Sequence, residues 1–110
     1  MLRSVICVAI LIVAGAASSA AQDLKAQGEK VFAAQKCALC HSIGGKGNVK
    51  GPLDEAVTKL SADEIRAWIT DAKGMTAKTK ATRKPAMKEF SLPKGDVDAL
   101  VAYLVALKTK

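Results

Sequence analysis

Two cysteines and a histidine lie within five consecutive residues of the chain. Cys37 and Cys40 are separated by two small or apolar residues, and His41 follows Cys40 directly. Thiolates and imidazoles are nucleophiles and metal ligands. Residues three positions apart lie on the same side of a helical turn, so both thiols can face one partner while the histidine adjoins it. The chemistry of the chain therefore centres on Cys37, Cys40 and His41.

Four kinds of site use cysteines at this spacing, and three of them fit the rest of the sequence poorly. A structural zinc site needs four ligands, but the chain has a single histidine and no second Cys-x-x-Cys pair. A dithiol redox pair belongs with βαβ units, and no strand pattern precedes Cys37. A disulfide between residues three apart would constrain almost no loop. Cys-x-x-Cys-His is the attachment motif of c-type haem. The sequence therefore predicts one haem c, bound covalently through Cys37 and Cys40, with His41 as an iron ligand.

The second axial ligand decides whether such an iron only exchanges electrons or also binds small molecules. The chain has no second histidine, and methionine is the natural alternative. Beyond the initiator, the candidates are Met75 and Met87. Pro85 stiffens the approach to Met87, whereas Met75 follows an apolar helical segment and can fill a gap in a core. We expect Met87 to be the ligand, with Met75 as the alternative.

The first 21 residues have the pattern of a secretory signal peptide. Arg3 is followed by an apolar run over residues 5–13 and then by small residues that end at Ala21. The apolar run is shorter than the about 20 residues that span a membrane. We therefore expect cleavage after Ala21, a mature domain over residues 22–110, and a periplasmic protein without stable membrane insertion.

Helical periodicity dominates the remaining chain, and strand patterns are weak. The first expected elements are a helix over residues 24–36, a glycine-rich loop over 42–52 and a helical turn over 54–59. A helix over residues 62–74 and an extended basic loop over 73–90 follow. The last helix is expected to begin between residues 93 and 96 and to end near residue 108. Ser61 and Glu64 form a capping box for the middle helix, and Gly74 is expected to end it. The last helix has a buried stripe of Val97, Leu100, Val101, Leu104 and Leu107. The predicted fold is all-α, with three main helices, short turns and long loops.

The motif and its surroundings resemble a small bacterial class I cytochrome c over residues 24–108. The residues that carry the resemblance are Gly28, Phe32, Cys37-Ala38-Leu39-Cys40-His41, Gly51-Pro52-Leu53, Trp68, Met87, Leu100 and Tyr103. The resemblance implies a cytochrome c fold around one haem, with the first and last helices crossing near Gly28. It also implies that the Pro52 carbonyl accepts the Nδ1 proton of His41, and that Trp68 donates its indole N–H to a haem propionate.

The chain is basic, with 17 Lys and Arg residues against 10 Asp and Glu residues and a net charge of +7. Export and the lack of aromatic residues among the lysines argue against nucleic acid and favour acidic protein surfaces as partners. Six cations occupy the segment that carries Met87, where we expect them to surround the exposed haem edge: Lys73, Lys78, Lys80, Arg83, Lys84 and Lys88.

A haem with both axial positions filled has one-electron exchange as its chemistry. We therefore expect a monomeric electron carrier rather than an enzyme. Its partners would be redox proteins with acidic docking surfaces, such as a dehydrogenase or quinol-oxidising complex and a terminal reductase or oxidase. Two alternatives use the same motif. One is a haem enzyme or gas-binding protein with a labile sixth ligand, and the other is a dedicated cytochrome subunit of a dehydrogenase or reductase complex.

Overall fold

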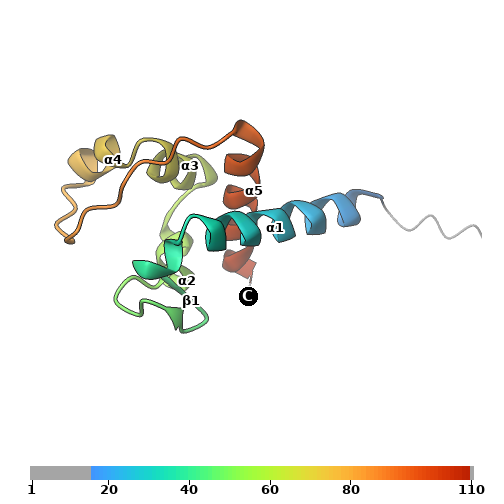
Figure 1. The fold of residues 1–110 in the computed structure, drawn as a ribbon, viewed down its shortest axis with the longest axis horizontal. Helices are drawn as coiled ribbons and strands as arrows, with labels where there is room; N and C mark the ends of the chain where they lie inside the picture. Colours follow the sequence, from blue (N-terminus) through green and yellow to red (C-terminus); the bar gives the residue numbers. More distant parts are fainter. Residues whose placement is uncertain (1–15, 110) are drawn as a thin grey trace, which may run out of the picture.

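The structure is a computed structural model that describes residues 16–109 of the 110-residue chain. The apolar run of the predicted export signal, residues 5–13, lies outside the described residues. In chain order the elements are α1 (Ala16–Ala34), η1 (Cys37–Leu39), β1 (Ser42–Ile43), β2 (Lys46–Gly47), α2 (Leu53–Ala56), η2 (Val57–Lys59), α3 (Ala62–Thr70), α4 (Ala72–Thr79), α5 (Lys94–Val105) and η3 (Ala106–Thr109). The all-α prediction is confirmed (Figure 1). Within the described residues, no helix has the length and apolar character needed to span a membrane.

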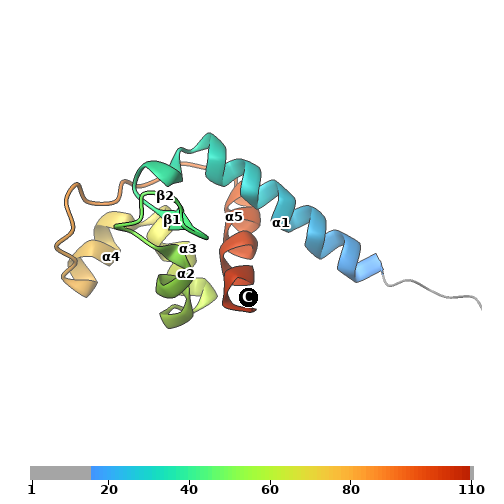
Figure 2. The ribbon, with the colours of Figure 1, turned by 90° about the horizontal axis from the view of Figure 1, so that it is seen from below.

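Helices α1 and α5 cross in close contact, as Figures 1 and 2 show from two directions. Gly28 permits this crossing, because a Cβ at its position would overlap the carbonyl of Ala99 and the Cβ of Tyr103. Next to it, the rings of Phe32 and Tyr103 pack edge to face with their centroids 5.8 Å apart. The helix crossing near Gly28 that the family resemblance implied is present.

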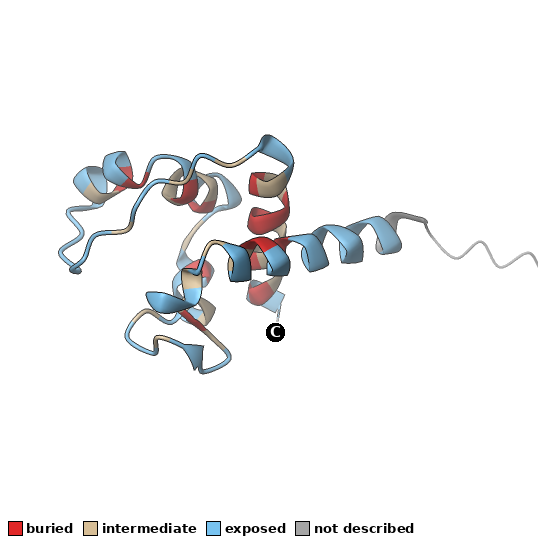
Figure 3. Ribbon diagram, in the orientation of Figure 1, coloured by how far each residue is buried: buried red, intermediate tan, exposed pale blue. Residues whose placement is uncertain are grey.

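Helix α1 begins earlier than the sequence predicted. Its first turns are rich in alanine, the best helix former, and they extend the helix to the N-terminal side of Leu24. The expected cleavage position after Ala21 lies inside this helix. At the other end, α1 stops at Ala34, and Lys36 takes a left-handed backbone conformation with φ 58°. The described side chains of its N-terminal half are exposed, and this part projects from the rest of the molecule (Figure 3).

Helix α5 provides one side of the hydrophobic core. All five residues of the predicted stripe are buried: Val97, Leu100, Val101 and Leu104 on α5, and Leu107 on η3, which continues the chain after α5 ends at Val105. They pack with Val31 of α1, Val57 of η2, and Ile65 and Ile69 of α3. Figure 3 shows these buried segments facing one another where the helices meet. The core therefore fixes α1, α3 and α5 relative to one another.

The segment after Ser61 forms two helices instead of the single helix that was predicted. The capping box is present, with Ser61 Oγ accepting from the N–H of Glu64 and the Glu64 carboxylate accepting from the N–H of Ser61, each at 3.1 Å. Helix α3 ends because Asp71 leaves the helical conformation, with φ −144° and ψ 53°. The Asp71 carboxylate then caps α4 by accepting from the N–H of Gly74 at 3.2 Å. Gly74 thus lies in the first turn of a new helix rather than at a helix end.

The extended loop that was expected over residues 73–90 is correspondingly shorter. Helix α4 takes up its first part, and the loop begins at Lys80, whose φ is 56°. Residues 80–93, called the 80–93 loop below, run along the edge of the molecule back to α5 (Figure 1). The N–H of Phe90 donates to the carbonyl of Ile69 at 3.1 Å and so attaches the end of this loop to α3.

The glycine-rich segment over residues 42–52 forms a small antiparallel hairpin, with Ser42 opposite Gly47. Gly44 and Gly45 have φ values of 58° and 78°, which glycine adopts without steric cost. The helical turn predicted over residues 54–59 is present as α2 and η2.

Candidate functional site

A largely apolar cavity of about 860 Å³ lies between α3, α5, residues 37–41 and the 80–93 loop. This volume is within the range of roughly 300–1,000 Å³ that is typical of cofactor and small-molecule pockets. Apolar side chains from the core and from its edge form most of the cavity wall: Phe32, Leu53, Val57, Leu60, Ile65, Trp68, Ile69, Phe90, Leu100 and Leu104. The helix packing therefore leaves room for a large apolar group beside the core.

Cys37 and Cys40 lie on and directly after the turn η1, and both line this cavity. The left-handed backbone of Lys36 redirects the chain from α1 into this turn. Cys37 is half-buried, Cys40 is exposed, and the two are not joined as a disulfide. Burial raises the pKa of the Cys37 thiol, against smaller opposing effects of a backbone hydrogen bond and of the positive charge of Lys88. Two thiols on one wall are placed to react with a single bound group.

His41 also lines the cavity, and the backbone of Gly51 orients its ring. Nδ1 of His41 is 3.2 Å from the carbonyl oxygen of Gly51, and a carbonyl only accepts, so Nδ1 carries the proton. The unprotonated Nε2 is then available as a metal ligand. Burial lowers the pKa of His41, the hydrogen bond to Gly51 opposes this effect, and the charge of Arg83 adds to the lowering. The net lowering favours the neutral imidazole, which is the form that binds metals.

The hydrogen-bond partner of His41 is Gly51 and not Pro52, so the prediction for the Pro52 carbonyl is wrong. The Gly51 carbonyl also accepts from the N–H of Ser42 at 3.0 Å, which directs it toward residues 41 and 42. Pro52 is instead the N-cap residue of α2, and an N-cap carbonyl accepts the first hydrogen bond within its own helix. Pro52 does not line the cavity.

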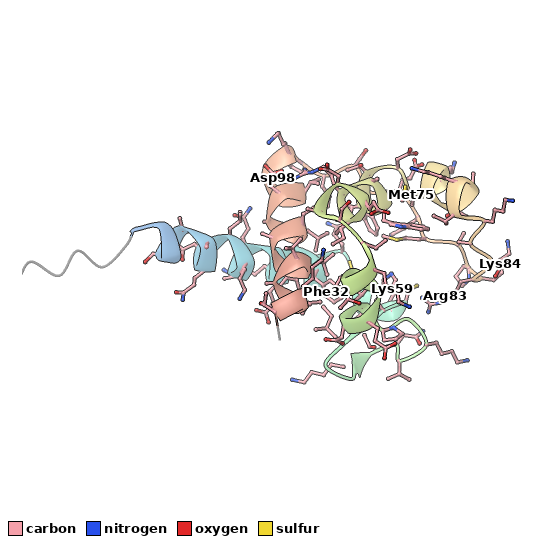
Figure 4. All side chains as sticks on the ribbon, turned by 180° about the vertical axis from the view of Figure 1, so that it is seen from behind. Phe32, Lys59, Met75, Arg83, Lys84 and Asp98 are labelled. Carbon is pink, nitrogen blue, oxygen red and sulfur yellow. The ribbon has the colours of Figure 1, made fainter. Side chains whose placement is uncertain are left out.

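The remaining predicted site residues, Trp68 and Met87, both line the cavity and are half-buried. Trp68 comes from α3, and Met87 comes from the 80–93 loop. Met75, the alternative methionine, lies on α4 (Figure 4), where it is buried with 6% of its surface exposed. It does not line the cavity. The structure therefore places Met87 around the same cavity as His41 and both cysteines, and places Met75 elsewhere.

Four cations contribute to the wall or rim of the cavity: Lys36, Lys59, Arg83 and Lys88. Among the residues that the structure describes, no Asp or Glu side chain does so. The sequence analysis placed Arg83 and Lys88 near the cofactor, but it did not identify Lys36 or Lys59. The position of Lys36 directly before Cys37 could have indicated it, whereas Lys59 reaches the cavity only through the tertiary fold. The other cations expected near the cofactor do not line the cavity: Lys73, Lys78, Lys80 and Lys84.

The cavity and its donor atoms fit a covalently bound haem. Two thiols on one wall, a neutral imidazole with an available Nε2 and an apolar lining meet the needs of attachment and axial ligation. Across residues 16–109, no three or more His, Cys, Asp and Glu side chains are grouped so that they could hold a metal ion. A family model described as cytochrome c matches residues 25–108. The chain belongs to the cytochrome c family.

The match extends from the middle of α1 into η3 and so contains every residue around the cavity. It confirms the resemblance to a class I cytochrome c that was found from the residues alone. As a member of the cytochrome c family, this chain is a haem-binding electron-transfer protein, and the family implies haem c attached through Cys37 and Cys40. Neither the curated proteins nor the solved structures gave a match to this chain.

Proposed function

We propose that this cytochrome c is a monomeric, periplasmic carrier with a single haem, in which His41 and Met87 ligate the iron. The observation that carries the proposal is the position of Met87 on the cavity that also receives His41, Cys37 and Cys40. The bound group would supply one-electron exchange between ferric and ferrous iron, and the protein residues bind, orient and shield it.

Each residue at the cavity has a distinct role in this proposal. Cys37 and Cys40 would hold the haem through thioether bonds. His41 would ligate through Nε2, while the Gly51 carbonyl keeps the proton on Nδ1, fixes the ring and increases the basicity of the ligand. Trp68, half-buried at the cavity wall, would donate its indole N–H to a haem propionate.

Methionine ligation and the apolar wall act on the reduction potential in the same direction. A methionine–histidine ligand pair raises the potential. A wall of apolar side chains also disfavours the additional positive charge of the ferric form, since charge is costly in an apolar environment. With His41 and Met87 both bound to the iron, no coordination position would remain open for a substrate. These properties support an electron carrier over an enzyme.

The proposed partners are redox proteins with acidic docking surfaces. The cations at the cavity support this assignment, because they give the region around the cofactor one sign of charge. A dehydrogenase or a quinol-oxidising complex would then act as the electron donor. A terminal reductase or oxidase would act as the acceptor.

A redox titration with spectra of both oxidation states tests the proposal. We expect one one-electron transition, and a haem that stays with the chain after denaturation because it is covalently attached. We also expect slow, weak binding of carbon monoxide to the reduced protein, since Met87 occupies the position that the gas needs. Rapid, tight binding would instead support the haem enzyme or gas-binding alternative.

A further inference from the structure

Arg83 connects the two sides of the cavity. It lies on the 80–93 loop, four residues before Met87, and its side chain extends to Gly51, beside the backbone of Cys40. The guanidinium Nη1 of Arg83 and the carbonyl oxygen of Cys40 both occupy space that a Cβ at Gly51 would need. The absence of a side chain at Gly51 therefore allows the guanidinium to pack directly against the backbone of this turn.

The turn that Arg83 contacts is the one that orients the proposed histidine ligand. The Gly51 carbonyl accepts from Nδ1 of His41 at 3.2 Å and from the N–H of Ser42 at 3.0 Å. One side chain thus links the loop of Met87 to the backbone that holds His41. Arg83 also lines the cavity itself, so its positive charge lies beside the space that the haem would fill.

We propose that Arg83 is a positioning residue that holds the loop of Met87 against the Gly51 turn and, through its charge, raises the reduction potential of the bound haem. This inference rests on the proposed function, in which His41 and Met87 are the ligands. Uptake of one electron from a donor protein lowers the charge of the haem by one. A nearby cation therefore stabilises the reduced form relative to the oxidised form.

Three variants of the haem-loaded protein separate the charge of Arg83 from its contacts. Arg83→Gln removes the positive charge. Arg83→Lys keeps the charge but replaces the planar guanidinium group with a smaller ammonium group. Lys84→Gln is the matched control, because Lys84 is the next cation along the chain and does not line the cavity. Figure 4 shows Arg83 and Lys84 close together on the loop, with Arg83 nearer to Lys59.

The midpoint potential reports the effect of the charge. At a fixed ambient potential, we expect Arg83→Gln to shift the ratio of reduced to oxidised protein about threefold to tenfold toward the oxidised form. A tenfold shift corresponds to about 59 mV for a one-electron couple. We expect Arg83→Lys to retain most of the wild-type potential, and Lys84→Gln to match the wild type.

The temperature at which the ferric methionine–iron absorption band disappears reports the positioning role. We expect both Arg83 variants to lose the band at a lower temperature than Lys84→Gln does. Equal potentials in Arg83→Gln and the wild type, or equal shifts in Arg83→Gln and Lys84→Gln, would refute the charge effect. An unchanged thermal loss of the band would refute the positioning role. Absence of the band from the wild type would instead contradict ligation by Met87, and so the proposed function.

Discussion

At the level of single residues, a backbone carbonyl determines which nitrogen of His41 can bind a metal. The Gly51 oxygen accepts from both His41 and Ser42, so its direction is set by the backbone pairing between residues 42 and 52. This orientation does not depend on the rotamer of a second side chain. The family resemblance implied an acceptor one residue away, at Pro52. It could not assign the correct carbonyl, because the direction of each carbonyl depends on the exact residue at which α2 begins.

The two methionines give a prediction that separates ligation from packing. Met87→Ala should abolish the ferric methionine–iron band and lower the reduction potential, because the thioether ligand is removed. Met75→Ala should keep the band but reduce the free energy of unfolding by about 2–5 kcal/mol, as expected for truncating a buried side chain. Absorption spectra and denaturant unfolding of both variants measure the two effects. Loss of the band in Met75→Ala alone would transfer the ligand role to Met75.

At the level of helices, the crossing of α1 and α5 depends on one missing side chain. Gly28→Ala should lower the free energy of unfolding by about 1–3 kcal/mol, because its Cβ would overlap the Ala99 carbonyl and force the helices apart. Gly95→Ala is the matched control on α5, where a Cβ meets no atom within 4 Å. It should stabilise the protein by about 0.4–1 kcal/mol through the unfolded chain. Thermal or denaturant unfolding compares the two, and equal effects would contradict a tight crossing.

The helices also show which features of secondary structure the sequence pattern predicts and which helix boundaries it does not. The apolar stripe of α5 and η3 and the capping box of Ser61 could both be predicted, because each is a local sequence pattern that is typical of one structure. The break between α3 and α4 could not, because the apolar spacing continues across Asp71 from Ile69 to Ala72, and both of these residues are buried. An aspartate that caps the next helix resembles an ordinary exposed residue until the backbone conformation is known.

At the level of the whole molecule, the cavity collects side chains from Phe32 in α1 to Leu104 in α5. The cysteine–histidine motif and Met87 could be identified in advance, because short stretches of sequence contain their chemistry. The contribution of Lys59 could not, because it depends on how distant helices pack. The same packing supplies the apolar wall for the haem. The tertiary fold thus determines both the apolar interior of the site and part of the charge around it.

This distribution of charge predicts how electron transfer responds to salt. Lys36 and Lys59 line the cavity, whereas Lys25 and Lys30 are exposed on α1 and do not. For an acidic redox partner, the second-order rate of the wild type should fall steeply as ionic strength rises. Lys36→Gln combined with Lys59→Gln should lower the rate at low salt several-fold and flatten this dependence. Stopped-flow measurements over a range of salt concentrations provide both quantities.

The paired variant Lys25→Gln with Lys30→Gln tests whether position or total charge matters, because it lowers the net charge by the same amount. We expect it to retain most of the wild-type rate and salt dependence, since its changes are away from the cavity. Equal losses in both pairs would assign the effect to net charge, and a flat profile for the wild type would contradict electrostatic docking. Near 1 M salt the Debye length is only about 3 Å. The rates of all three proteins should therefore converge there, because long-range attraction no longer distinguishes them.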